Sequence, residues 1–287
     1  MLHFRKYHGL GNDFVFVDAR ESTVDFTPEL AIALCDRHRG IGADGLLLWR
    51  GSVERPSMQV VNADGSQPEM CGNGLRCFVK ALLDHYAPKV AEISVLTGAG
   101  LLRCTVTRDG HGHVAMVAVR MGKGEFEPAQ VPIAADKPLI NMEIAGLNLP
   151  LKWTALSVGN SHVVTFDLID EAGRLALGPI VSRHPLFPRG VNVGFVQILA
   201  EKDGQPRMRV DVHERGCGWT QACGTGATAA AIASVNAQLN KQGVEIAVIL
   251  PGGTLGITVD GQGVATMRGP ATEVYAGAID LRAFTVA

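Results

Sequence analysis

The sequence predicts an α+β fold with two pseudo-symmetric domains, each a curved, mostly antiparallel sheet wrapped around a central helix. Three observations lead to this prediction. The chain repeats its own motifs once, most of its segments are short and bounded by turn residues, and one clear helix follows each of two Cys-Gly motifs. A chain of 287 residues is long enough for two domains that each bury a core.

The repeat consists of four landmarks that return in the same order about 150 residues later. The pairs are GLGNDFVF at 9–16 with SVGNSHVV at 157–164, RGIGADG at 39–45 with RGVNVGF at 189–195, VVNADGSQPEMCGNG at 60–74 with VHERGCGWTQACGTG at 212–226, and LTGAGLL at 96–102 with LPGGTLG at 250–256. Because chance rarely places four pairs in register, the halves are predicted to be copies of one domain. The domains are expected to be 1–122 and 123–287, with the boundary in a stretch rich in Gly, Pro and charge.

Short segments that end at Gly or Asp-Gly are predicted to form the strands. They are 15–18, 58–61, 101–107 and 114–119 in the first half, and 193–199, 208–213, 244–250 and 255–259 in the second. Such short, turn-punctuated strands are typical of antiparallel sheets.

One helix is predicted after each Cys-Gly motif. In the first half, apolar residues recur at helical spacing from Leu75 to Tyr86, and Pro88 stops the pattern. In the second half, the segment 227–240 is small and apolar on nearly every face before Gly243. A helix without a polar face is usually buried, so this helix is expected to lie inside its sheet.

Composition and charge narrow the class of partner. With 26 basic and 28 acidic residues the net charge is −2, and neither sign forms a long block, which favours a small-molecule partner over nucleic acid. No apolar run is long enough to predict a membrane span. The first residues lack the features of a signal peptide, so the protein is expected in the reducing cytoplasm, with its six cysteines as thiols.

The two best-matched segments, CGNG at 71–74 and CGTG at 223–226, each stand where a strand and turn enter a helix. The N–H groups of a first helical turn attract negative charge, and a cysteine there can have its pKa lowered from about 8.5 into the range of about 3.5–7.5. Glycine also lets backbone donors approach a carboxylate closely. Each turn therefore offers both a base and an anion site.

Two such turns predict a two-base racemase or epimerase that needs no metal or organic cofactor. If a pseudo-two-fold axis relates the halves, Cys71 and Cys223 flank one α-carbon across a cleft. One thiolate then removes the α-proton, the opposite thiol returns a proton to the other face, and the N–H groups stabilise the charge on the carboxylate.

Other interpretations explain these residues less well. Cys35, Cys77, Cys104 and Cys217 do not recur at symmetric positions and are expected to pack as small apolar residues. A zinc site made of Cys71, Cys77, Cys217 and Cys223 is disfavoured. Five residues separate the cysteines of each pair, whereas two to four are usual. The glycines at 9–11 lack a nucleotide-binding pattern, and a cysteine hydrolase using His162 leaves the second turn unexplained.

The motifs in order resemble those of the diaminopimelate epimerases. They are HGLGNDF at 8–14, RHRGIGADG at 37–45, NADGSQPEMCGNGLRC at 62–77, GNSH at 159–162, RGVNVGF at 189–195, ERG at 214–216, QACGTGA at 221–227 and LPGG at 250–253. The resemblance implies conversion of LL-diaminopimelate to meso-diaminopimelate, on the route to lysine and cell-wall precursors. It also implies that the C-terminal strand, after about residue 271, joins the first domain.

The resemblance further implies roles for individual residues. Cys71 and Cys223 match the two acid/base thiols, and His162 and Glu214 match residues that tune them. Donors to the reacting carboxylate are expected from Gly72, Asn73, Gly224 and Thr225. The substrate-holding positions are matched by Asn12, Asn62, Asn160, Asn192, Glu214 and Arg215. Such a set suits a substrate with two zwitterionic ends, because its distal end needs a cation, an anion and amides.

Two positions depart from the family pattern, and one suggests an oligomer. Gly45 stands where many members carry a Gln that contacts substrate, and Ser161 stands where Pro is usual before the histidine. Tyr275 resembles a position used in dimer contact, which implies a homodimer.

Two other functions stay open from the residues. A racemase of another amino acid, such as histidine, would use the same two thiols, because they act only on the α-carbon. A binding or thiol-redox module could instead use the cysteines as a reversible disulfide, but such a sensor has no need of the asparagines, Glu214 and Arg215.

Overall fold

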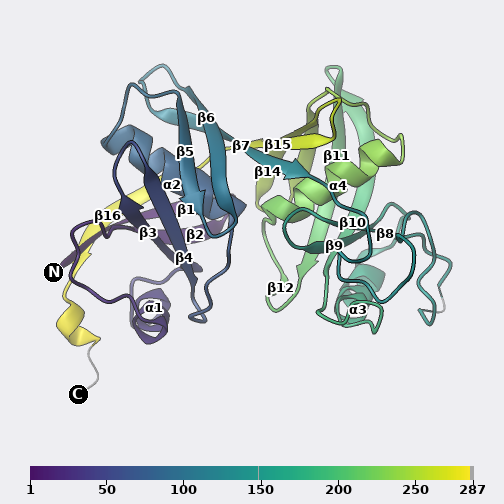
Figure 1. The fold of residues 1–287 in the computed structure, drawn as a ribbon, viewed down its shortest axis with the longest axis horizontal. Helices are drawn as coiled ribbons and strands as arrows, with labels where there is room; N and C mark the ends of the chain where they lie inside the picture. The colour runs from purple at the N-terminus through teal and green to yellow at the C-terminus, as the bar shows by residue number, and fades with distance from the viewer. Residues whose placement is uncertain (148, 285–287) are drawn as a thin grey trace. The chain divides into compact units, whose positions relative to one another are not determined.

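The computed structural model describes residues 1–147 and 149–284, and the chain divides into two compact units (Figure 1). The first unit comprises Met1–Val119 and Gly269–Ala287, and the second comprises Arg120–Arg268. The first division follows Val119 inside a strand, β7 (Val114–Lys123), and the boundary expected after residue 122 falls within the same strand.

The first unit is built from a sheet and two helices. Along the chain its elements are β1 (Leu2–Gly9), β2 (Asn12–Asp18), α1 (Pro28–Cys35), β3 (Gly45–Gly51), β4 (Pro56–Asn62), α2 (Gly72–His85), β5 (Glu92–Thr97), β6 (Gly100–Arg108), β7 and, from the C-terminal end, β16 (Thr272–Ile279). In space the strands follow the order β16-β1-β2-β3-β4-β5-β6-β7. The pairs β2–β3 and β4–β5 are parallel, and the pairs β16–β1, β1–β2, β3–β4, β5–β6 and β6–β7 are antiparallel.

The second unit repeats this plan. After the last residues of β7 come β8 (Thr154–Ser157), β9 (Ser161–Thr165), α3 (Glu171–Ser182), β10 (Asn192–Lys202), β11 (Gln205–Glu214), the short β12 (Gly218–Trp219), α4 (Gly224–Asn236), β13 (Ile246–Leu250), β14 (Gly253–Val259) and β15 (Val264–Gly269). The strand order is β7-β15-β14-β13-β11-β10-β9-β8, and β12 pairs with β11. The parallel pairs are β9–β10 and β11–β13.

The two units share one order of elements, which confirms the predicted fold class. Apart from the short β12 of the second unit, each has two strands, a helix, two strands and a second helix followed by three strands, and the parallel pairs fall at equivalent places. The remaining η1 (Leu281–Ala283) is a short 3-10 helix after β16. An α+β fold of two similar units follows from this duplication.

The central helix of each unit is buried, as the apolar pattern predicted. Helix α2 contacts β1, β2, β3, β4 and β16, and helix α4 contacts strands on both sides of β11 (Figure 1). In α4, residues from Ala227 to Ser234 are all buried, which explains why this helix has no polar face. Small side chains let the surrounding strands approach it closely.

Helices α1 and α3 were missed by the sequence analysis. Thr27 caps α1 by accepting the Leu30 N–H at 3.3 Å, with Pro28 in the first turn. Helix α3 contains Pro179, which lacks an N–H and disfavours helix, and Gly178, whose hypothetical Cβ would lie 2.8 Å from Trp219. Tertiary packing therefore overrides local propensity in α3.

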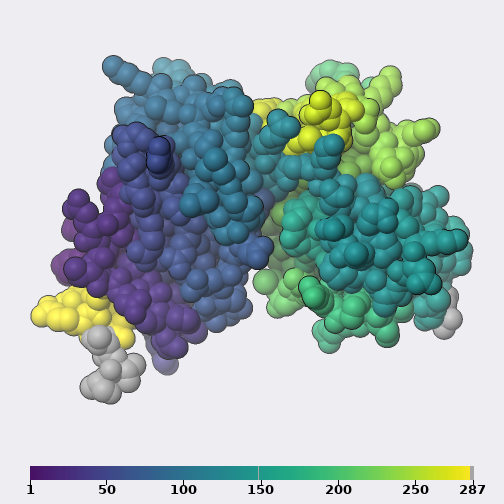
Figure 2. Space-filling view, in the orientation of Figure 1, coloured from purple at the N-terminus to yellow at the C-terminus, as the bar shows by residue number. Residues whose placement is uncertain are grey.

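The C-terminal strand completes the first unit. β16 pairs with β1 in antiparallel register from Leu2 opposite Ile279 to His8 opposite Thr272. Figure 1 shows the yellow β16 beside the purple β1, and in Figure 2 the yellow residues after this strand lie next to purple residues of the first unit. Among the described residues, no helix is long and apolar enough to cross a bilayer.

Candidate functional site

The first Cys-Gly turn begins α2 with Cys71 as its N-cap residue. The Cys71 Sγ accepts the Gly74 N–H at 3.4 Å, and the helical ladder starts with the Leu75 N–H to the Cys71 carbonyl. The first N–H groups of a helix have no carbonyl of the same helix to bind, which suits such a turn to an anion. The turn thus places the Cys71 thiol at the start of the helix, next to its backbone donors.

Asn12 lies beside this turn. Its Oδ1 accepts a hydrogen bond from Asn73 Nδ2 at 3.1 Å, and its Nδ2 donates to Asp44 Oδ2 at 2.8 Å. Asp44 also binds Arg37, which bridges to Asp13. Asn12 therefore reaches the Cys71 turn through Asn73, and the sequence analysis did not identify the carboxylate that orients it.

Asn62 is the last residue of β4, at the end of the strands where β2 and β3 begin. Its Nδ2 donates to Ser66 Oγ at 2.9 Å, and its backbone pairs with Gly45 across the β3–β4 ladder. A Cβ at Gly45 would come 2.8 Å from the Val61 carbonyl oxygen. In this chain, a side chain at position 45 would require the neighbouring strand β4 to shift.

The second turn has the same local geometry. Cys223 is the N-cap residue of α4, its Sγ accepts the Gly226 N–H at 3.3 Å, and the Ala227 N–H donates to the Cys223 carbonyl. At the third helical position of both turns, a side chain would press against a neighbouring side chain. A Cβ at Gly74 would lie 2.9 Å from Leu47, and one at Gly226 would lie 2.9 Å from Val212.

A chain of hydrogen bonds leads from His162 to the Cys223 thiol. His162 Nε2 lies 2.9 Å from Asn160 Oδ1, Asn160 Nδ2 donates to Thr225 Oγ1 at 3.3 Å, and Thr225 Oγ1 lies 3.5 Å from Cys223 Sγ. Because the amide oxygen only accepts, the ring nitrogen is the donor. The Thr225 hydroxyl, which accepts from Asn160, can then donate to sulfur.

The charge states in this cluster follow from burial. Burial lowers the pKa of His162 to about 3, and the positive charge of Arg215 adds to this effect, so the imidazole is neutral. Burial also raises the pKa of the Cys223 thiol well above its ordinary value. The Glu214 carboxylate raises it further, while hydrogen bonds from Thr225 and the Gly226 N–H act in the opposite direction.

The carboxylate and guanidinium expected at this site are positioned by strand β11 and the turn after it. Glu214 accepts a hydrogen bond from Thr220 Oγ1 at 2.6 Å. The Arg215 N–H donates to Asn192 Oδ1 at 2.8 Å, and its guanidinium donates to the Arg189 carbonyl at 2.7 Å. Asn192 is buried and lies opposite His162 in the parallel β9–β10 register.

The predicted site residues therefore form two groups, one in each unit. The first contains Asn12, Asn62, Cys71, Gly72 and Asn73, and the second contains Asn160, His162, Asn192, Glu214, Arg215, Cys223, Gly224 and Thr225. Tyr275 lies outside both groups, on β16, where it is 45% exposed and packs edge-on against Phe4. Groups of three or more potential metal-binding side chains are not found among the described residues.

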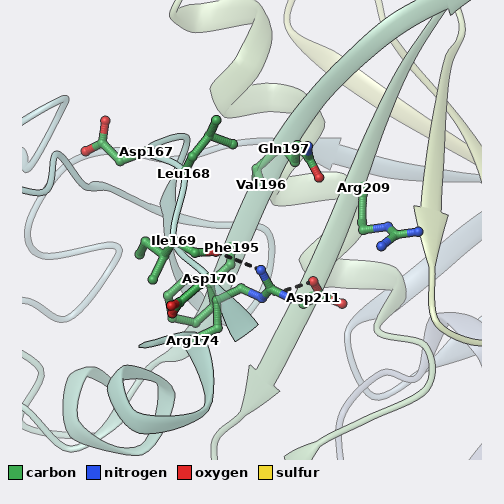
Figure 3. A pocket seen from close by; sticks show the side chains of 10 residues that line it. All are labelled: Asp167, Leu168, Ile169, Asp170, Arg174, Phe195, Val196, Gln197, Arg209 and Asp211. Atoms are coloured by element: carbon green, nitrogen blue, oxygen red, sulfur yellow. Dashed lines mark hydrogen bonds and ion pairs between the residues drawn. The ribbon is translucent and has the colours of Figure 1, made fainter. Parts of the chain in front are cut away.

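A surface pocket of about 320 Å³ in the second unit is a different feature (Figure 3). It is lined in part by Asp170, Arg174 and Asp211, and none of the predicted site residues lines it. Arg174 binds Asp211 at 3.4 Å and the Ile169 carbonyl at 2.8 Å, so the charges of Arg174 and Asp211 pair with each other inside the pocket. This pocket is therefore separate from the two Cys-Gly turns.

The Thr225 hydroxyl is expected to support the reactivity of Cys223. In Thr225→Val, the sulfur loses a donor and the Asn160 amide loses its acceptor, so epimerisation should slow by about ten- to a hundred-fold. Thr225→Ser keeps the hydroxyl and is the matched control. Steady-state rates of both variants check this expectation, and equal rates for valine and serine would contradict it.

Comparison with known proteins identifies the family to which these turns belong. The family model described as diaminopimelate epimerase matches residues 4–127 and 154–274. The chain belongs to the diaminopimelate epimerase family. A diaminopimelate epimerase from Leptospira biflexa is 40% identical over 285 residues, covering 98% of this chain and 99% of the relative. One from Moorella thermoacetica is 41% identical over 283 residues, covering 96% and 98%.

Solved structures of more distant proteins share the fold of this chain. A phenazine biosynthesis protein of the PhzF family from Bacillus anthracis gives a TM-score of 0.69 at 15% identity, covering 97% of this chain and 99% of its own. A probable proline racemase from Agrobacterium radiobacter gives 0.68 at 16% identity, covering 100% and 96%. At such identities the likeness concerns the fold alone.

Proposed function

We propose that this protein is an isomerase that epimerises LL-diaminopimelate to meso-diaminopimelate, in lysine and cell-wall precursor biosynthesis. Its similarity to curated diaminopimelate epimerases along nearly the whole chain supports the reaction. The observation that carries the mechanism is the duplicated turn. Cys71 and Cys223 each cap a buried helix, and each sulfur accepts a hydrogen bond from the N–H three residues on.

The proposed reaction moves one proton at each face of the α-carbon. A thiolate takes the α-proton, and the electron pair left on carbon delocalises into the carboxylate, which the N–H groups of the helix starts stabilise. The opposite thiol then donates its proton to the other face. The net result is an inverted centre and an exchanged thiol–thiolate pair, which proton exchange with water resets.

The charges around Cys223 suggest where the resting proton lies. Burial and the neighbouring Glu214 carboxylate both raise the pKa of this thiol, so we assign the proton to Cys223 in the absence of substrate. Cys71 is then the thiolate that removes the first proton. Glu214 can relay the proton of Cys223 when the reaction runs in the reverse direction.

We assign recognition of the distal end of the substrate to Arg215, Glu214 and the asparagines. Arg215 supplies a planar, permanently charged fork suited to a carboxylate. The mechanism requires no metal or organic cofactor, and we place the enzyme in the cytoplasm. No nucleic acid or membrane partner is implied by the charge distribution of the chain.

The test is incubation with LL-diaminopimelate in deuterium oxide. We expect meso-diaminopimelate to form with one deuterium at the inverted carbon, and chelators to leave the rate unchanged. Chiral chromatography and mass spectrometry follow both isomers. Racemisation of histidine without action on diaminopimelate would favour the racemase alternative, and absence of any exchange with retained thiol oxidation would favour the redox module.

We also propose a homodimer in which Tyr275 contributes to the contact. Val274 and Tyr275 are 55% and 45% exposed on β16, which is the first strand in the order of its sheet. Exposed apolar residues on an edge strand favour association with another chain. Tyr275→Asp should therefore shift the protein from dimer to monomer in light scattering, whereas the exposed Leu101→Asp control in β6 should not. A Tyr275→Asp protein that stays dimeric would refute this contact.

A further inference from the structure

Arg76 is a fully buried cation of the first unit that the proposed reaction does not use. It lies on α2, and its exposed fraction is 0%. Its guanidinium donates to the Gly72 carbonyl at 3.4 Å, to Asn73 Oδ1 at 3.0 Å and to the Pro270 carbonyl at 3.2 Å. Burying a charge is costly unless it is well hydrogen-bonded, so these contacts call for an explanation.

Two of the three acceptors, Gly72 and Asn73, belong to the first turn, so Arg76 lies in contact with it. Gly72 and Asn73 are the first residues of α2, and Pro270 follows the point at which the chain returns to the first unit. Strand β1 leaves room for the guanidinium at Gly9, where a Cβ would lie 3.0 Å from Arg76 Nη2. Arg76 thus ties the start of α2 to the segment between β15 and β16.

The directions of these hydrogen bonds fix the orientations of the Asn73 and Asn12 amides. A guanidinium only donates, so it holds the Asn73 oxygen toward itself and turns the Asn73 amide nitrogen toward Asn12 Oδ1. At the other end, the Asp44 carboxylate only accepts and holds the Asn12 nitrogen. With a donor at one end and an acceptor at the other, both amides are locked in one orientation.

The charge of Arg76 also acts on the thiol of this turn. Burial lowers the pKa of Arg76, and negative charge on Cys77 or Cys71 raises it, so the cation and a Cys71 thiolate stabilise each other. The equivalent position of the second turn is Thr228. Its neutral hydroxyl donates to the Gly224 carbonyl at 2.8 Å, the counterpart of the Gly72 carbonyl.

We propose that Arg76 is a positioning residue for the proposed epimerisation, which orients Asn73 and Asn12 at the first turn and supports Cys71 as the base. This inference rests on the proposed function. It assigns the two turns different roles, because the first carries a buried cation and the second lies beside the Glu214 carboxylate. Arg76 acts through these neighbours and need not touch the substrate.

The experiment compares Arg76→Met and Arg76→Lys with Lys80→Met. Lys80 is a cation further along the same helix, which binds Asp84 and the Val114 carbonyl away from the turn. Arg76→Met should lower kcat by about a hundred-fold and leave KM within a few-fold, because the turn moves while the distal contacts remain. Arg76→Lys should recover part of kcat, since one ammonium keeps the charge but cannot reach three acceptors.

A second readout needs no substrate. Alkylation of Cys71 by iodoacetamide, followed by peptide mass spectrometry, should slow in Arg76→Met and stay unchanged in Lys80→Met. Melting temperatures of all variants separate a loss of stability from a loss of rate. Where Arg76→Met does not fold, Arg76→Lys should still show a lowered kcat.

Each outcome decides one of the two proposals. A folded Arg76 variant with wild-type kcat and wild-type alkylation overturns the role of Arg76. Equal losses of kcat in Arg76→Met and Lys80→Met overturn it as well, because they show only a structural effect. If the wild type does not act on diaminopimelate while Arg76→Met still slows alkylation of Cys71, the substrate assignment fails and the positioning role stands.

Discussion

Replacing either Cys71 or Cys223 with alanine is expected to abolish conversion of LL-diaminopimelate to meso-diaminopimelate. Each face of the α-carbon would have one acid/base group, and the loss of either interrupts proton transfer at that face. General acid–base catalysis contributes about 10²–10⁴-fold, so the rate should fall by at least this factor. Chiral chromatography of the product measures the loss directly.

Cys104→Ala is the matched control for these variants. Cys104 is a fully buried thiol of β6, and burial raises its pKa to about 12, so it stays protonated. Its removal should lower the melting temperature and leave kcat unchanged. Activity retained in Cys71→Ala or Cys223→Ala would refute the two-thiol mechanism without affecting the assignment to the family.

Arg215→Met is expected to lower kcat/KM for diaminopimelate by about 10²–10³-fold, because a carboxylate brought into the site would lose its charged partner. The wild type should reject lysine and histidine by about 10⁴-fold, as sites built to bind a polar group reject analogues without it. Both ratios come from steady-state rates measured with each amino acid. Both sulfurs should remain titratable in the variant, since the Arg215 guanidinium donates to the Arg189 carbonyl and its backbone N–H to Asn192.

Arg209→Met provides the control for a lost surface charge. Arg209 is an exposed arginine of the same strand, β11, and it lines the separate surface pocket (Figure 3). Its removal should leave kcat/KM unchanged. If the wild type turns over lysine or histidine as fast as diaminopimelate, the fold and the two-thiol reaction remain, and the protein is a racemase of broader specificity.

The sequence predicted those parts of the molecule that depend on local pattern and on duplication. The helix after Cys71 and the small-residue helix after Cys223 follow from apolar spacing and from glycine at the turns. Strand β4 precedes the turn at Cys71, and strand β11 precedes the turn at Cys223. Both were predicted because they carry alternating or apolar runs. Repetition of CGNG as CGTG was enough to single out the two thiols from six cysteines.

Elements with mixed signals were not predicted. Helix α3 carries Gly173, Gly178 and Pro179, which locally disfavour helix, and it forms because its buried side packs against the sheet. Strands β1 and β16 lie at opposite ends of the chain. The family resemblance implied that the strand after about residue 271 joins the first domain, and β16 does so, but no window of sequence contains its pairing with β1. Such elements depend on partners far away in sequence.

The sequence by itself determined the duplicated fold, the thiol pair and the families of chemistry open to it, because each is written in adjacent residues. Only the tertiary structure decided how Arg76, Asn73, Asn12 and Asp44 join into one oriented chain, and how His162 reaches Cys223 through Asn160 and Thr225. In the sequence, Arg76 stands out only as a charged residue among the apolar residues of a central helix. Its partners could not be read from the sequence, because hydrogen-bond direction and burial arise only when distant segments pack together.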